Sequence, residues 1–180
     1  MMPISHIFTL IGCVGVPLLR GSTVVIMKTI VPKRIFKAVE QYRIDFLVGA
    51  PTVYQVLLRN YDPGKYDISS LKYAISGASP MDIGLYKELK EKMGIEVLQG
   101  YGLTETLPVT CNPKSKIIPE SVGIVGRGAV LKIVDEKGRE RKPGESGEIL
   151  VGGVSIMKGY FNREKETRDV LVDGFVRTGD

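Results

Sequence analysis

LKYAISGASPMDIGLYKELKEKMGIEVLQGY, residues 71–101, shows the clearest alternation of strand and helix patterns in this chain of 180 residues. It opens with the apolar, strand-like segment Leu71–Ser76 and closes with a second one, Ile95–Gln99. Between them, apolar residues recur at a spacing of four, as on one face of a helix: Met81, Leu85, Leu89 and Met93. Asp82 near the start and Gly94 just past the end are typical capping residues. A strand, a helix and a strand at this spacing predict a parallel βαβ unit.

The same alternation extends toward the N-terminus. Pro32 is a typical first residue of a helix, which continues to Arg43. One apolar face of this helix is formed by Ile35, Phe36, Val39 and Tyr42. Asp45–Gly49 is typical of a strand that leads into a helix ending at Asn60, and the β-branched segment Ser22–Met27 is typical of a further buried strand. We therefore predict an α/β fold with a parallel sheet flanked by helices.

The pattern changes in the last third of the chain. Short apolar segments such as Val130–Asp135 and Glu148–Val151 are separated by turn-rich stretches, which is typical of β-hairpins. We place a boundary near residues 113–120 and predict two domains. Residues 1–115 form the parallel α/β part, and residues 116–180 form a small antiparallel β subdomain.

The composition excludes several classes of protein. The formal net charge is only +5, from 25 Lys and Arg against 20 Asp and Glu, and no dense basic stripe is present, so no nucleic-acid partner is expected. One histidine and two cysteines, Cys13 and Cys111, are too few for a zinc site and suit a reducing cytoplasm. The longest apolar run, Ile7–Leu19, has 13 residues, fewer than the ~20 that a transmembrane helix needs, and predicts a buried core segment.

Two loops that follow predicted strands carry residues suited to a nucleotide. In open parallel sheets, ligands bind at the carboxyl ends of the strands. Ser76–Pro80 consists mostly of small residues, which let a flat ring or a phosphate approach the backbone, although a tight turn alone would also explain them. Residues 99–106, QGYGLTET, offer two glycines, an aromatic ring and hydroxyl groups. They also contain Glu105, a carboxylate of the kind that holds Mg²⁺ beside substrate phosphates. Together the two loops predict a nucleotide site.

The segment Tyr101–Thr106, YGLTET, resembles the signature of the adenylate-forming superfamily, which includes acyl-CoA synthetases, firefly luciferase and the adenylation domains of peptide synthetases. Other segments are similar to elements of this family and follow in its order: Pro3–Phe8, Ser76–Pro80, Gly147–Val151, Ser155–Tyr160 and Gly174–Asp180. Residues 49–54, GAPTVY, resemble the branches that act on fatty and aryl acids. The resemblance covers almost the whole chain.

The resemblance implies roles for individual residues. The adenine would be enclosed by Gly77, Ala78, Ser79, Gly100 and Tyr101. Thr104 would contact the phosphate and Glu105 would coordinate Mg²⁺, which makes both catalytic candidates. Asp180 would accept hydrogen bonds from the ribose hydroxyls, since a carboxylate is only an acceptor. His6 and Phe8 would line the acyl pocket, and His6, the third catalytic candidate, would contact the reacting carboxylate.

The resemblance implies that the parent protein is an AMP-forming acid–CoA ligase, which activates a fatty or aryl acid with ATP and transfers it to coenzyme A. An amino-acid adenylation domain and a luciferase-like enzyme share most of these motifs. A non-catalytic nucleotide-binding scaffold is the alternative from another class. Thr9 stands where the family usually has glycine, so the acid is not identified. Gly159 and Tyr160 fit a structural turn.

Two parts of the family pattern have no counterpart in the sequence. These are the N-terminal phosphate loop that ends in Pro-Lys-Gly and the C-terminal lid domain with its adenylation lysine. We therefore expect a central fragment that is inactive on its own. We also expect it to self-associate through apolar faces around Ile7–Leu19 that an intact enzyme would bury.

Overall fold

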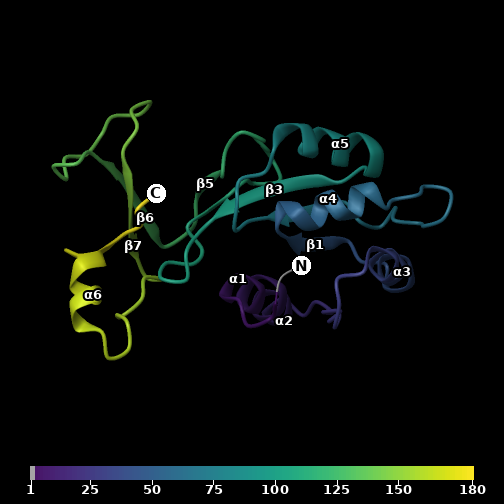
Figure 1. Cartoon of the computed structure of the whole chain (residues 1–180), viewed down its shortest axis with the longest axis horizontal. Coiled ribbons are helices and arrows are strands. Elements are labelled where there is room, and N and C mark those ends of the chain that lie inside the picture. Colours follow the sequence, from purple (N-terminus) through teal and green to yellow (C-terminus); the bar gives the residue numbers. More distant parts are fainter. Residues whose placement is uncertain (1–2) are drawn as a thin grey trace. The chain divides into compact units, whose positions relative to one another are not determined.

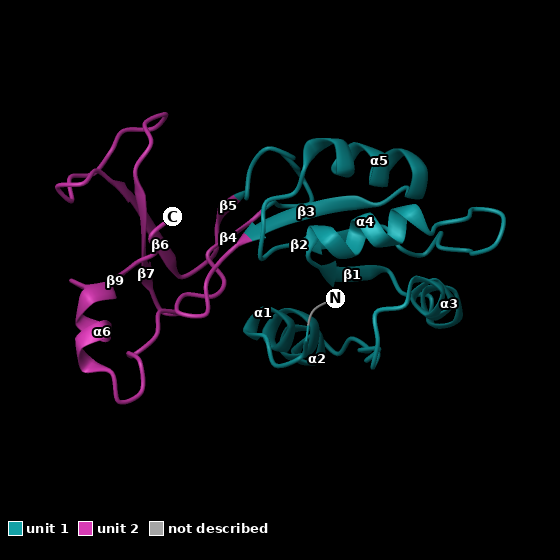
Figure 2. Ribbon diagram, in the orientation of Figure 1, with its two compact units in different colours: residues 1–100, 112–123 teal, residues 101–111, 124–180 magenta. Residues whose placement is uncertain are grey.

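The computed structural model describes residues 3–180 (Figure 1); residues 1 and 2, the start of the predicted first domain, lie outside this part. It divides into two compact units, coloured separately in Figure 2. Of the described residues, unit 1 comprises residues 3–100 and Asn112–Gly123, and unit 2 comprises Tyr101–Cys111 and Ile124–Asp180. Because the chain leaves unit 1, returns and leaves again, neither unit is one continuous segment. The division into residues 1–115 and 116–180 stays a prediction.

Unit 1 contains the predicted parallel sheet (Figure 1). Its strands are β1 (Phe46–Gly49), β2 (Tyr73–Ser76) and β3 (Glu96–Tyr101), the last of which ends on the first residue of unit 2. β2 lies between β1 and β3, and Gly49, Ser76 and Gln99 lie opposite one another at the carboxyl ends of the strands. The loops that follow these strands therefore begin at one edge of the sheet.

Three predicted helices are confirmed in unit 1: α3 (Pro32–Tyr42), α4 (Pro51–Arg59) and α5 (Ile83–Met93). Their apolar faces pack with the sheet into one core, in which Phe36 and Leu89 are fully buried. Burial of a side chain of this size contributes about 1.5–3 kcal/mol to stability. α5 begins after Asp82, whose Oδ1 accepts a hydrogen bond from Leu85 N at 3.0 Å. It ends at Gly94, whose φ of 68° is the left-handed conformation that glycine adopts readily.

Two predictions about the N-terminal part are wrong. Residues 7–19 form three short helical segments, α1 (Ile7–Thr9), the π-helix η1 (Leu10–Gly15) and α2 (Val16–Leu19). Only Thr9 among them is buried and Leu19 is 87% exposed, so this run is not a core segment. Ser22–Met27 forms no strand, because β-branched residues need a neighbouring strand and no described strand pairs with them. None of the helices in residues 3–180 has the length and apolar composition that a membrane crossing requires.

One residue of α3 also departs from the prediction. Tyr42, expected on the apolar face of the helix, is 56% exposed. It is the last residue of α3, and the chain turns at Arg43, which has a positive φ of 49°. The end of the helix therefore does not continue the buried face that Ile35, Phe36 and Val39 form.

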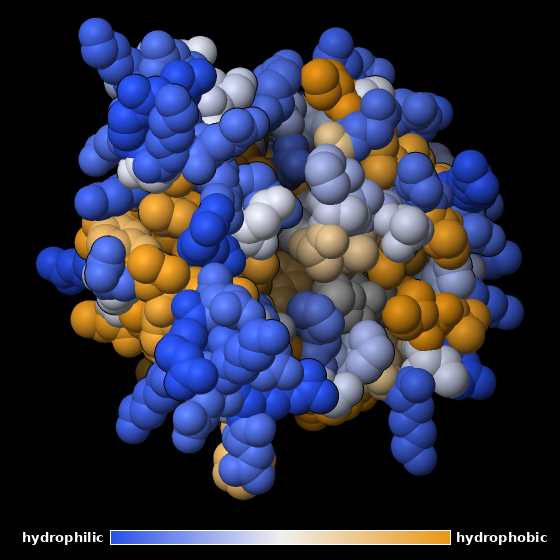
Figure 3. Space-filling view, turned by 60° about the vertical axis from the view of Figure 1, so that its left-hand side comes forward, coloured by the Kyte–Doolittle hydropathy of each residue, from blue (hydrophilic) through white to orange (hydrophobic). Residues whose placement is uncertain are grey.

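Unit 2 contains the predicted antiparallel sheet. Its strand order is β6-β7-β9-β8, with β6 (Ala129–Val134), β7 (Glu148–Gly153), β8 (Leu171–Val172) and β9 (Phe175–Arg177). The predicted antiparallel pairing is confirmed, since Val134 lies opposite Glu148, at the strand ends that residues 135–147 connect. The helix α6 (Glu164–Val170) was not predicted, because it is short and mostly polar. On the face drawn in Figure 3, hydrophobic residues form patches between hydrophilic ones.

A short antiparallel pair completes the first sheet. β4 (Thr110–Cys111) pairs with β5 (Ile124–Val125), and both belong to unit 2. The strand order of the mixed sheet is β1-β2-β3-β4-β5.

Candidate functional site

In unit 1, a predicted acyl-pocket residue lies against the predicted adenine loop. The ring of Phe8, in α1, covers Gly77, the first residue after β2, so closely that a Cβ on Gly77 would lie 3.1 Å from Phe8 Cζ. A larger residue at position 77 would therefore push against the ring. The next residue, Ala78, has a φ of 68°, which is uncommon for a residue other than glycine. Ala78 and Ser79 are exposed, so the loop presents small side chains to a ligand.

The single histidine is the N-cap of α1. His6 Nδ1 accepts a hydrogen bond from Phe8 N at 3.2 Å. Because Nδ1 is the acceptor in this hydrogen bond, Nε2 is the ring nitrogen left to contact a ligand. Because His6 is exposed, its Nε2–H can donate to a bound acceptor such as a carboxylate. The structure thus brings His6, Phe8 and Gly77 together within unit 1.

In unit 2, Tyr101 and Asp180 are in direct contact. The Tyr101 hydroxyl donates to Asp180 Oδ2 at 2.5 Å. Burial, and then this hydrogen bond, raises the pKa of Tyr101 to about 12. The backbone of Asp180 is also held, since its N–H donates to Thr178 Oγ1 at 3.1 Å and its carbonyl accepts from Ile149 N at 3.1 Å. These bonds fix the position of the Asp180 carboxylate just after β9.

The Glu105 carboxylate is also held by a tyrosine of unit 2. The Tyr160 hydroxyl donates to Glu105 Oε1 at 2.8 Å, and this hydrogen bond raises the pKa of Tyr160. The same segment supports the backbone nearby: Met157 N donates to the Glu105 carbonyl at 2.7 Å, and Ser155 Oγ donates to the Thr106 carbonyl at 3.0 Å. The sequence alone predicts Tyr160 only as part of a structural turn. Its hydrogen bond to Glu105 gives it a further part in the candidate site.

The remaining predicted residues are Gly100 and Thr104, which lie in β3 and in the turn that follows it. Gly100 lies in β3, directly after the buried Gln99 and directly before Tyr101. Thr104 lies in a turn and is exposed, so its hydroxyl is accessible to a ligand. The predicted residues therefore fall into one group on unit 1 and another on unit 2.

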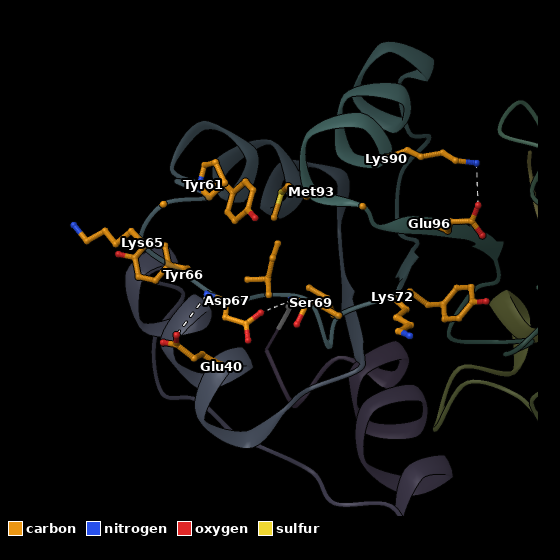
Figure 4. A pocket seen from close by; sticks show the side chains of 16 residues that line it. Glu40, Tyr61, Lys65, Tyr66, Asp67, Ser69, Lys72, Lys90, Met93 and Glu96 are labelled. Atoms are coloured by element: carbon orange, nitrogen blue, oxygen red, sulfur yellow. Dashed lines mark hydrogen bonds and ion pairs between the residues drawn. The ribbon is translucent and has the colours of Figure 1, made fainter.

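An open cavity of about 910 Å³ lies at the other edge of the parallel sheet of unit 1 (Figure 4). Tyr73 and Glu96, the first residues of β2 and β3, are among its lining residues. Lys90 on its rim forms an exposed ion pair with Glu96 at 2.9 Å, drawn as a dashed line in Figure 4. None of the predicted site residues lines this cavity. The predicted residues that follow β2 lie instead at the carboxyl edge of the sheet.

The donor set for a metal is small. Within residues 3–180, no three His, Cys, Asp or Glu side chains lie close enough together to hold a metal ion. Glu105 supplies one carboxylate, which is half-buried and already oriented by Tyr160. This donor suits Mg²⁺, which in many sites takes one or two protein carboxylates and completes its coordination with water and substrate phosphates.

Comparison with known proteins gives one consistent family. The model of a family described as AMP-binding enzyme matches residues 1–161. The chain is 34% identical over 182 residues to the feruloyl-CoA synthase of Amycolatopsis sp, covering 99% of this chain and 37% of the relative. It is 31% identical over 185 residues to the long-chain-fatty-acid–CoA ligase of Bacillus subtilis (strain 168), covering 100% of this chain and 33% of the relative.

Solved structures of similar proteins have the same fold. A long-chain-fatty-acid-CoA ligase from Archaeoglobus fulgidus matches with a TM-score of 0.91 and 31% identity, over 99% of this chain and 39% of that protein. An anthranilate CoA ligase in complex with anthranoyl-AMP matches with a TM-score of 0.89 and 26% identity, over 96% of this chain and 34% of that protein. The chain thus spans only about a third of the length of the curated relatives that it matches.

Proposed function

The chain belongs to the AMP-binding enzyme family, and from this we propose that the protein is an AMP-forming acid–CoA ligase. It activates a carboxylic acid with ATP to an acyl-adenylate and then transfers the acyl group to coenzyme A. This class of reaction is supported by relatives named feruloyl-CoA synthase, 4-coumarate-CoA ligase, long-chain-fatty-acid–CoA ligase and indoleacetate–CoA ligase.

The observation that best supports this proposal is the hydrogen bond between Tyr101 and Asp180. It joins two residues that are 79 positions apart and that both belong to the proposed nucleotide site. In the proposal, the Asp180 carboxylate accepts hydrogen bonds from the ribose, and the Tyr101 ring stacks on the adenine. A carboxylate that accepts from Tyr101, on a residue whose backbone N–H and carbonyl are also hydrogen-bonded, needs little reordering when the nucleotide binds.

The small residues of unit 1 complete the adenine site in this proposal. Gly77, Ala78, Ser79 and Gly100 let the purine approach the backbone. The support comes from the loop geometry, since Ala78 adopts a left-handed conformation and the side chains of Ala78 and Ser79 are exposed.

We assign the phosphate end of the site to the turn at Thr104 and Glu105. The Thr104 hydroxyl donates to a phosphate oxygen, and Glu105 would supply a carboxylate ligand to Mg²⁺. When bound, Mg²⁺ supplies positive charge that stabilises the leaving pyrophosphate. The hydrogen bond from Tyr160 orients the Glu105 carboxylate for this task.

The acid binds, in this proposal, beside Phe8 and Gly77. The Phe8 ring offers an apolar wall suited to an aryl or alkyl group, and Nε2–H of His6 donates to the acid's carboxylate. A carboxylate oxygen attacks the α-phosphorus, and the bond from that phosphorus to the pyrophosphate oxygen breaks. The thiolate sulfur of coenzyme A then attacks the acyl carbon, and AMP leaves. The protein contributes mainly by positioning the reactants and by stabilising charge.

Two further proposals concern the setting of the protein. The small number of cysteines, Cys13 and Cys111, supports a reducing compartment such as the cytoplasm. The exposed apolar residues of η1 and α2, among them Leu18 at 59% and Leu19 at 87%, support self-association through this segment.

The proposed reaction is tested by supplying the complete protein with ATP, Mg²⁺, coenzyme A and one acid at a time, namely acetate, benzoate or a long-chain fatty acid. We expect an acyl-CoA thioester, AMP and pyrophosphate in equal amounts from benzoate or the fatty acid, and little product from acetate. AMP release without a thioester would assign the protein to another adenylating reaction. No acid-dependent product at all would favour a non-catalytic nucleotide-binding protein.

A further inference from the structure

A single buried side-chain amide joins three segments of unit 1. Gln99, at the carboxyl end of β3, is only 7% exposed. Its Oε1 accepts a hydrogen bond from Met81 N at 3.1 Å, and its Nε2 donates to the Pro119 carbonyl. Gln99 thus connects β3 by hydrogen bonds to Met81, just before α5, and to Pro119, in the loop that follows β4.

A second buried amide holds that loop in shape. Asn112 is 3% exposed, and its backbone N–H donates to the Gln99 carbonyl at 2.9 Å. Its side chain accepts from Ile118 N at 2.9 Å and donates to the Ser121 carbonyl at 2.5 Å. Because Asn112 fixes both flanks of Pro119, the acceptor for Gln99 Nε2 is itself held in place. Buried amides satisfied in this way make a local structure specific.

The loop between β2 and α5 has few other supports. Residues 78–80 are exposed, and Ala78 is in a left-handed conformation. Ser76 lies opposite Gln99 in the sheet, but its Oγ has no hydrogen-bond partner within the described residues and does not anchor the loop. The hydrogen bond from Met81 N to Gln99 is therefore a direct side-chain link between the end of this loop and β3.

We propose that Gln99 is a positioning residue for the purine, because it sets the spacing between residues 77–79 and Gly100. This inference rests on the proposed function, in which these two segments enclose the adenine. Gln99 is itself buried, so it acts through the backbone of Met81 and through its own neighbour Gly100. Displacement of a positioning group by about 1 Å can reduce a rate by about 100-fold, so a small change in spacing suffices for a measurable effect.

The test replaces Gln99 by Met, which has a similar length but cannot form either hydrogen bond. The first readout is hydrogen exchange of the Met81 amide in the described chain, which we expect to accelerate at least tenfold in Gln99→Met. The second is acid-dependent pyrophosphate exchange by the complete protein with ATP and with GTP. We expect the ratio of kcat/KM for ATP to kcat/KM for GTP to fall at least tenfold, mainly through KM for ATP.

The control is Leu89→Ala, which removes a buried side chain of α5 that lies outside the loop. It lowers stability, and loss of folded protein reduces the rates with ATP and GTP equally, so the ratio stays unchanged. If hydrogen exchange of the Met81 amide becomes faster but the ATP-to-GTP ratio of kcat/KM stays the same, the role of Gln99 is overturned and the proposed function is not. Unchanged hydrogen exchange of the Met81 amide would have the same consequence. A wild-type protein without pyrophosphate exchange would overturn the proposed function and this assignment with it.

Discussion

The hydroxyl of Tyr160 orients the carboxylate of Glu105. Removing this hydroxyl measures how much the orientation contributes to the rate. Tyr160→Phe deletes the donor of the 2.8 Å hydrogen bond and keeps the ring. A net hydrogen bond contributes about 1 kcal/mol, so we expect acid-dependent pyrophosphate exchange to fall about fivefold. Tyr42→Phe is the matched control, since Tyr42 is 56% exposed in α3, and its rate should not change. Equal rates for the two variants would show that Tyr160 only closes a turn.

The contact between Tyr101 and Asp180 predicts a defined dependence on pH. The phenol is neutral when protonated, and burial with the hydrogen bond to Asp180 raises its pKa to about 12, above the ordinary value of about 10. The folded state therefore binds this proton more tightly than the unfolded state, and the stabilisation is fully present below about pH 10 and is lost as the pH rises toward 12.

The ionisation of Tyr101 is measured by following phenolate absorbance against pH in the wild type and in Tyr101→Phe. The difference between the two curves belongs to Tyr101. We expect a midpoint near 12. Asp180→Ala should lower the midpoint, because the acceptor is gone. A midpoint near 10 in the wild type would contradict the contact.

Among the elements, α5 offers the clearest test of local structure. Asp82→Ala removes the acceptor of the hydrogen bond from Leu85 N. Loss of an N-cap costs about 1 kcal/mol, so urea unfolding should show a decrease of about this size in the free energy of unfolding of the chain. Glu91→Ala, an exposed position of the same helix, should change it by less than about 0.5 kcal/mol. Similar losses in both variants would mean that the cap is not formed.

The elements also show how far the sequence predicts the fold. α5 was predicted because an apolar period of four and two capping residues agree, and the hairpin of β6 and β7 was predicted from alternating apolar and turn residues. Ser22–Met27 was predicted wrongly, since β-branched residues become a strand only when another strand pairs with them. α6 was missed because Glu164–Val170 has no apolar period.

The candidate site was predicted less completely than the fold. The family resemblance named Tyr101, Glu105 and Asp180, but neither the hydrogen bond of Tyr101 to Asp180 nor that of Glu105 to Tyr160 could be read from the sequence. The partners are 79 and 55 positions apart, and spacing in the chain carries no information about such contacts. The partner role of Gln99 also depends on the folded positions of Met81 and Pro119.

At the scale of the whole molecule, the apolar surface of η1 and α2 predicts association of the described chain. Leu18 and Leu19 are the most exposed apolar residues there. Contiguous apolar patches above a few hundred Å² favour protein contacts, so the mass measured by light scattering should rise with concentration. The double variant Leu18→Glu and Leu19→Glu should reduce it, whereas Val154→Glu, at a position 89% exposed in unit 2, should not. A wild-type monomer at high concentration would refute the association.

The central claim is that the complete protein activates a carboxylic acid at a nucleotide site that includes Glu105. Acid-dependent ATP–pyrophosphate exchange in the wild type and in Glu105→Gln tests it most directly, because the amide keeps the size of the side chain but binds Mg²⁺ poorly. We expect exchange only when an acid is present, and at least a tenfold fall in the variant, about 1.4 kcal/mol in the barrier. Thioester formation from a preformed acyl-adenylate should fall less, since it releases no pyrophosphate. Absence of exchange with every acid, or equal losses in the two half-reactions, would contradict the account.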